Sequence, residues 1–132
     1  MTYKFEKIEQ LEGKTLTRVE RVGDEELWFY TTDNKVVKMY HIQECCESVY
    51  IEDIAGDLND LQGNPVLRAE VRTENDNADY GVLMYTFYEI STIKGSVTIR
   101  WCGSSNGYYG IEVDIAEFDV DEEGDLVYGD DY

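Results

Sequence analysis

The sequence predicts a single α+β domain in which a mainly antiparallel sheet of about seven strands packs one face against one helix. Three observations lead to this fold class. The 132 residues suit one domain with one hydrophobic core. Apolar and polar residues alternate with a period of two along most of the chain, which is typical of half-buried strands. Residues 49–62 instead space their apolar side chains as on one face of a helix.

Seven alternating segments predict the strands of this sheet. They lie at about 15–22, 26–32, 35–42, 66–72, 82–91, 96–102 and 109–115. In the last segment, four apolar residues from Tyr109 to Ile115 share one face. Asp33 and Asn34 predict the turn of a hairpin between the second and third segments. Asn106 and Gly107 predict a second hairpin, which joins the last two segments.

The expected helix is the segment that departs from this alternation. Its apolar residues follow one another at i, i+3, i+4, i+7 and i+10, namely Ile51, Ile54, Ala55, Leu58 and Leu61. Ser48 can cap its start, and Gly63 and Pro65 supply stop signals after its end. We expect the helix and the sheet to bury one set of apolar residues together: Val97, Ile99, Trp101, Ile111, Val113, Ile54 and Leu58.

The charge of the chain limits the partners that it can bind. Twenty-nine acidic residues against eleven basic ones give a formal net charge of −18. Such a surface repels nucleic acid, anionic lipid and free phosphate, so we expect no direct nucleic-acid partner and no membrane partner. Residues 101–132 contain ten carboxylates and no lysine or arginine. Within the single domain 1–132, we therefore expect residues 117–132 to form an acidic C-terminal hairpin or tail.

The expected compartment is the cytoplasm. The sequence contains no apolar run of membrane-spanning length, and we expect no signal peptide. Its three cysteines, an odd number, are poorly suited to a disulfide framework, which favours a reducing environment.

The only histidine lies close to two of the cysteines. His41, Cys45 and Cys46 fall within six residues, and Cys102 could join them in the fold. Imidazole and thiolate are good zinc ligands, and His41 could also serve as the base for a thiol nucleophile. Adjacent cysteines do not easily point at one ion, however, and acidic surroundings raise the pKa of a thiol. We therefore expect a structural role for these residues, with no metal and no cofactor.

A second group of candidate residues surrounds the expected turn at Asn106 and Gly107. Small hydrogen-bonding residues between aromatic side chains could hold a nucleobase or a phosphate. The candidate ligand-binding residues are Arg100, Trp101, Ser104, Asn106 and Tyr108. Arg100 is the one cation nearby, and no phosphate-binding or common catalytic motif is present, so a connecting turn is the simpler interpretation.

The acidic C-terminal quarter offers a candidate surface for binding a partner protein. Its carboxylates are Glu112, Asp114, Glu117, Asp119, Asp121, Glu122, Glu123 and Asp125. Tyrosines beside them could act as aromatic anchors, namely Tyr108, Tyr109 and Tyr128. Residues 119–130 also partly match the ligand spacing of a calcium loop, although no helical pattern flanks them.

Two stretches of the chain resemble a family of small acidic phage and prophage proteins. They are HIQECCESVYIEDIAGDLNDL and TFYEISTIKGSVTIRWCGSSNGYYG. The family signature is a histidine followed by Cys-Cys-Glu-Ser-Val, an acidic helix, and an Arg-Trp-x-Gly-Ser-Ser-Asn-Gly-Tyr-Tyr hairpin. The resemblance covers roughly residues 11–115 and implies a phage setting without an activity. It also implies a shared core of His41, Cys45, Cys46, Glu47, Trp101, Gly103, Asn106 and Tyr108.

These observations favour a non-enzymatic protein that inhibits a host nucleic-acid-binding defence protein in the host cytoplasm. Its carboxylates would imitate a nucleic-acid backbone toward a basic surface, such as that of a CRISPR effector or a restriction enzyme. One alternative is a sponge that sequesters a nucleotide immune signal, in a pocket that a homo-oligomer could share between subunits. A second alternative is a metal- or thiol-dependent enzyme that uses the histidine and cysteine cluster. A third is that the charge only confers solubility.

Overall fold

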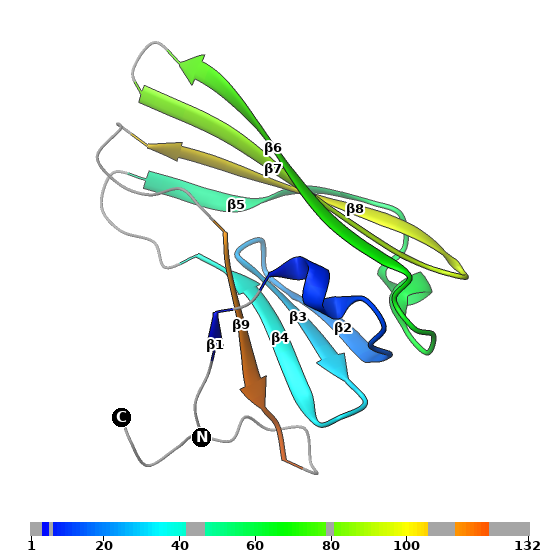
Figure 1. Ribbon diagram of the computed structural model, residues 1–132. Coiled ribbons are helices and arrows are strands. Elements are labelled where there is room, and N and C mark those ends of the chain that lie inside the picture. The colour runs from blue at the N-terminus through cyan, green and yellow to red at the C-terminus, as the bar shows by residue number, and fades with distance from the viewer. Residues whose placement is uncertain (1–3, 6, 42–46, 79–80, 106–112, 122–132) are drawn as a thin grey trace.

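Two antiparallel β-sheets form the architecture of the computed structural model (Figure 1), which describes residues 4–5, 7–41, 47–78, 81–105 and 113–121. The five-stranded sheet has the order β1-β9-β4-β3-β2, with β1 (Lys4–Phe5), β2 (Leu16–Val22), β3 (Glu26–Thr31), β4 (Lys35–Tyr40) and β9 (Asp114–Asp119). The four-stranded sheet has the order β5-β8-β7-β6, with β5 (Glu47–Ala55), β6 (Arg68–Ala78), β7 (Gly81–Thr92) and β8 (Gly95–Ser105). Two short 3₁₀ helices complete it, η1 (Ile8–Leu11) and η2 (Leu58–Leu61).

The hydrophobic core lies between the two sheets. Leu27, Phe29 and Met39 enter it from the five-stranded sheet, and the two 3₁₀ helices close it with Ile8, Leu11 and Leu61. The residues expected in the core are largely confirmed: Val97, Ile99 and Trp101 are buried in it, and Ile54, Leu58 and Val113 pack against it half-buried. The remaining expected core residue, Ile111, lies outside the described residues.

The predicted antiparallel pairing is confirmed, but the strands form two sheets instead of one, and the helix predicted over 49–62 is wrong. The α+β class is therefore not supported, because a second sheet takes the place of the helix against the core. Residues 47–55 form strand β5, and the described residues contain no α-helix. A β-bulge after Ile51 explains the misleading spacing, because it inserts one residue before Asp53. Ile51 and Ile54 therefore both approach the core although they are three residues apart. Leu58 and Leu61 belong to η2, in which i and i+3 side chains share a face.

The two predicted hairpins differ in outcome. The first is confirmed, because β3 and β4 pair across the turn at Asp33 and Asn34, and Asn34 adopts the positive φ of 61° that such a turn requires. The second is wrong. Strand β8 lies between β5 and β7, whereas β9 lies between β1 and β4 in the other sheet. The two strands before and after Asn106 and Gly107 therefore do not pair with each other.

The chain crosses between the sheets twice, and the two crossings are neighbours. The first leads from β4 to β5 and the second from β8 to β9. Because β4 pairs with β9 and β5 pairs with β8, the crossings begin and end at paired residues. Tyr40 lies opposite Asp114 in one sheet, and Glu47 lies opposite Ser105 in the other. We call the part of the molecule that these two residue pairs mark the corner.

Candidate functional site

The corner brings the two stretches singled out in the sequence to one end of the four-stranded sheet. Ser48, which follows the Cys-Cys-Glu segment, lies opposite Ser104 in the β5–β8 pair. Ser104 also lies opposite Leu83 of β7, so three strands contribute to this end. His41 directly follows β4 in the other sheet. Five of the candidate residues in these two stretches fall outside the described part of the chain, namely Cys45, Cys46, Asn106, Tyr108 and Tyr109.

Aromatic and charged side chains form two rows across the outer face of the four-stranded sheet, the face turned away from the core. One row joins Tyr50, Cys102 and Tyr85, which lie opposite one another on β5, β8 and β7. The next row continues from Arg100 to Phe87 and Arg72. The Arg72 guanidinium lies 4.2 Å from the centroid of the Phe87 ring, which is a favourable cation–π distance.

Burial is the main reason that Cys102 stays in its protonated form. Burial raises the pKa of the Cys102 thiol, and the nearby Glu52 carboxylate raises it further. The Tyr50 hydroxyl donates a hydrogen bond to the sulfur, and this bond raises the pKa of Tyr50. Arg100 Nη2 lies 2.7 Å from Glu52 Oε1, so the neighbouring guanidinium is already paired with that carboxylate. A protonated, buried thiol is a poor nucleophile.

We expect Cys102 to react slowly with iodoacetamide at neutral pH. The thiolate is the reactive form, so a raised pKa lowers its fraction at neutral pH, and the rate should climb as the pH rises through the alkaline range. Mass spectrometry of the peptide that contains Cys102 measures the rate. The same peptide in guanidinium-unfolded protein is the control and should react faster at neutral pH. Equal rates in the folded and unfolded protein would contradict the buried, protonated thiol.

Only His41 and Cys102 of the histidine and cysteine cluster lie within the described residues. His41 follows a strand of the five-stranded sheet, and Cys102 lies in the four-stranded sheet as a buried free thiol. Within the described residues, no group of three or more His, Cys, Asp or Glu side chains could hold a metal ion. Since Cys45 and Cys46 lie outside that part of the chain, the absence of a metal stays a prediction.

The candidate ligand-binding residues divide between two faces of β8. Arg100 and Ser104 lie on the outer face, whereas Trp101 points into the core and is only 1% exposed. Arg100 and Trp101 therefore do not line one pocket. The ion pair between Arg100 and Glu52 also reduces the positive charge that a phosphate would need.

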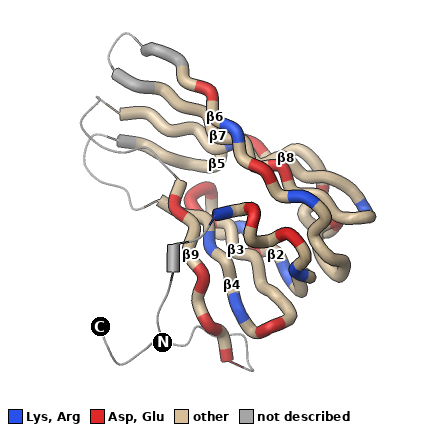
Figure 2. The backbone as a smooth tube through the Cα atoms, in the orientation of Figure 1, with Lys and Arg blue, Asp and Glu red and all other residues tan. Residues whose placement is uncertain are grey.

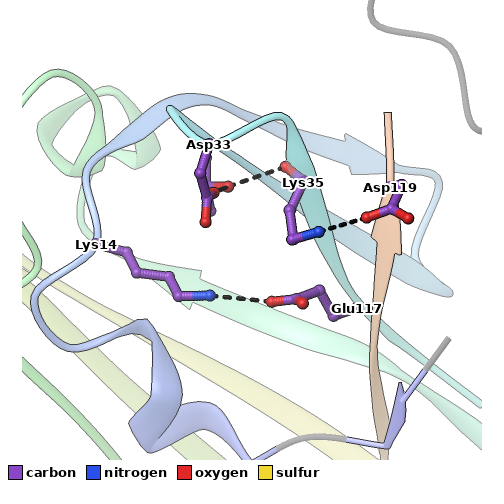
Figure 3. Close-up of polar contacts among 6 residues, drawn as sticks. Lys14, Asp33, Lys35, Glu117 and Asp119 are labelled. Atoms are coloured by element: carbon purple, nitrogen blue, oxygen red, sulfur yellow. Dashed lines mark hydrogen bonds and ion pairs between the residues drawn. The ribbon is translucent and has the colours of Figure 1, made fainter. Parts of the chain in front are cut away.

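The candidate partner-binding carboxylates divide in the same way along β9. Asp114 lies on the outer face of the five-stranded sheet, while Glu117 and Asp119 alternate with it on the opposite face. Figure 3 shows that both of these are paired with lysines, since Lys14 Nζ lies 3.0 Å from Glu117 Oε2 and Lys35 contacts Asp119. The contact with Asp119 raises the pKa of Lys35. Asp121 is exposed, and the rest of the set lies beyond the described residues: Glu112, Glu122, Glu123, Asp125 and Tyr128.

Sequence reasoning missed an aromatic and cationic cluster on the outer face of the five-stranded sheet. Lys38 Nζ lies 3.7 Å from the centroid of the Trp28 ring and 5.0 Å from that of Phe118. Partial burial between these rings lowers the pKa of Lys38. The turn at Asn34 fixes the register that places Trp28 opposite Lys38, so the sequence did contain the signal for this pair.

Comparison with known proteins supplies a family and no activity. No curated protein and no solved structure matches the chain. No helix in the part of the chain described above is long and apolar enough to span a membrane. The model of one family, described as a domain of unknown function, matches residues 9–115 and thereby covers β4, β5 and β8 but only the first two residues of β9. The chain therefore belongs to the DUF7448 family.

Proposed function

We propose that this protein is a non-enzymatic, acidic binding protein of phage type that inhibits a host nucleic-acid-binding defence protein. The target would be a CRISPR effector or a restriction enzyme in the host cytoplasm. Carboxylates of this protein would occupy the basic surface on which the target binds phosphates.

The observation that carries this proposal is that most cations of the described residues form ion pairs with carboxylates. Along β6, basic and acidic residues alternate (Figure 2), and Arg68 pairs with Glu70 and Arg72 with Glu74. The same holds in both sheets for Lys14, Arg18, Lys35 and Arg100. Paired cations contribute little to the field at a distance, so the surplus of carboxylates dominates the long-range field. Such a field attracts a basic surface and accelerates association with it.

The same observation disfavours the nucleotide sponge. A bound phosphate needs a cation that is free to pair with it, and the cation nearest the proposed ligand residues is Arg100. Glu52 already holds Arg100 at 2.7 Å. The enzyme alternative would use Cys45 and Cys46, which lie outside the described residues, and stays a separate proposal. The nucleotide sponge is tested by the experiment below.

The ion pairs of two β9 carboxylates change which residues we propose as the contact surface. Lysines neutralise Glu117 and Asp119, so these two contribute less to binding than the sequence suggested. The contacts that we propose first are the carboxylates outside these two lysine pairs, namely Glu112, Asp114, Asp121, Glu122, Glu123 and Asp125. Tyr108, Tyr109 and Tyr128 stay proposed as aromatic anchors.

The test is affinity purification of the tagged protein from cells that carry nucleic-acid-targeting defence systems. We expect a nucleic-acid-binding protein to co-purify and to dissociate at high salt, because exposed charges are screened there. Neutralising Glu122, Glu123 and Asp125 as Gln, Gln and Asn should weaken this complex. The matched control neutralises the exposed Asp24, Glu25 and Asp53 in the same way and should retain it. Release of a nucleotide on heating, with no protein partner, would overturn the proposal.

A further inference from the structure

Strand β6 is an edge of the four-stranded sheet, and the described residues cover it along only part of its length. Next to its start, the segment before β2 runs beside it: Gly13 N–H donates to Val66 O at 2.8 Å, and Val66 N–H donates to Lys14 O at 2.8 Å. At Ala69 the backbone N–H donates to Glu12 Oε2 at 3.0 Å. Beyond Ala69, β7 is the one strand that pairs with β6 among the described elements.

The register of β6 shows which backbone groups this open edge presents. In an antiparallel ladder, alternate residues direct both N–H and C=O away from the partner strand. The Ala69 N–H points away from β7, because it reaches Glu12. Since the β6–β7 register continues without a shift, Val71 and Thr73 point their backbone groups the same way. Both residues are exposed, and Val71 is an apolar side chain that is 44% exposed.

Hollows lie on both sides of this edge. On the inner side is a cleft of about 380 Å³, which is mostly apolar and is lined by Lys7, Glu9, Val71, Tyr88, Val113 and Ile115. On the outer side is a smaller hollow of about 100 Å³, lined by Glu70, Val71, Arg72, Phe87, Glu89 and Thr98. Val71 lines both. An unpaired strand edge with a hollow on each face is the geometry that binds an added strand, whose alternate side chains enter the two hollows.

We infer that the β6 edge from Val71 to Asn75 binds an extended segment of a partner protein as an added strand. The side chains of that segment that face the inner cleft are apolar, because Val71, Val113 and Ile115 line it. Those on the outer side are predominantly basic, because two carboxylates, Glu70 and Glu89, line the outer hollow against one guanidinium, that of Arg72. This inference goes beyond the charge-based proposal above, because its affinity comes from backbone hydrogen bonds and apolar contact.

A displayed library of random seven-residue linear peptides, selected on the purified protein, tests the inference. We expect selected peptides to alternate apolar and basic residues and to slow amide hydrogen exchange at Val71 and Thr73. Thr73→Pro removes an outward N–H without removing a bond to β7, and it should weaken binding about tenfold. Val71→Lys, which places a charge at the mouth of the cleft, should weaken it similarly. Val22→Lys is the matched control, since Val22 is a 38% exposed valine on edge strand β2 of the other sheet.

Two results would overturn this inference. One is a selection that yields no peptide sensitive to Val71→Lys. The other is peptides that bind Thr73→Pro and the unaltered protein equally. Thermal unfolding of each variant checks that the fold is kept. If the proline variant is unfolded, peptide binding to Val71→Lys still tests the inference. The peptide selection uses no defence protein. It can therefore fail while the proposed function holds, and it can succeed while the proposed function fails.

Discussion

Gly56→Ala is expected to destabilise the protein by about 3 kcal/mol. Gly56 directly follows β5 with φ +107°, a conformation that side chains rarely adopt. A Cβ atom there would lie 2.6 Å from the Ser96 carbonyl oxygen and 3.2 Å from Val97 Cα. Both neighbours are backbone atoms of β8, so relief of the clash requires the β5–β8 pair to open. Backbone strain and overpacking therefore act together at this position.

Urea unfolding followed by circular dichroism measures this loss, and Gly63→Ala provides the control. Gly63 also has a positive φ, +87°, but nothing lies within 4 Å of the Cβ position. Only the backbone strain applies there, so we expect a loss of about 1 kcal/mol. Similar losses in the two variants would show that close approach of β5 and β8 at Gly56 is unimportant.

Trp101→Ala is expected to lower the free energy of unfolding by about 3–5 kcal/mol. Trp101 is the largest fully buried side chain, and it fills the space between the two sheets. Its indole N–H is buried without a hydrogen-bond partner in the described structure, so the substitution removes no hydrogen bond. The loss therefore reflects the apolar contacts that disappear and the cavity that remains, less the desolvation cost of the buried N–H that the substitution also removes.

Trp28→Ala is the matched control, since it removes the same side chain from the outer face of the five-stranded sheet. Trp28 is half-buried and contacts Lys38 outside the main core. We expect a loss below half of that for Trp101→Ala, measured by the same urea unfolding. An equal loss would mean that the outer cluster stabilises the fold as much as the core between the sheets does.

Local alternation predicted strands β2 to β4 and β6 to β8, but it missed β5 and most of β9, and it could not predict which strands pair. The β3–β4 hairpin was predictable because Asn34 specifies the turn and the turn fixes the register. β5 was not, because one bulge residue after Ile51 turns a period of two into apparent helical spacing. Asn106 and Gly107 carry a strong hairpin signal, yet the strands on either side of them pair elsewhere. Partner choice depends on contacts far along the chain.

The candidate site shows the same division. The sequence singled out both stretches that meet at the corner, since their unusual residues are local features. It could not show that Arg100 and Trp101 face opposite sides of β8, although strict alternation implies it once the strand is recognised. The ion pairs of Glu117 and Asp119 join residues up to 103 positions apart. No local pattern identifies such partners.

The place of β9 has a consequence for the order in which the molecule can assemble during synthesis. β5 to β8 form a continuous sheet that is inserted between β4 and β9, and the contact between Lys35 and Asp119 spans 84 residues. The inserted sheet can pair as soon as β8 has left the ribosome, whereas β1 and β4 have no common neighbour until β9 follows. Closing so long a segment carries an entropic cost that the late contacts must offset. Newly made chains thus hold one complete sheet and one sheet that still lacks an inner strand, and chaperones would bind them during that interval.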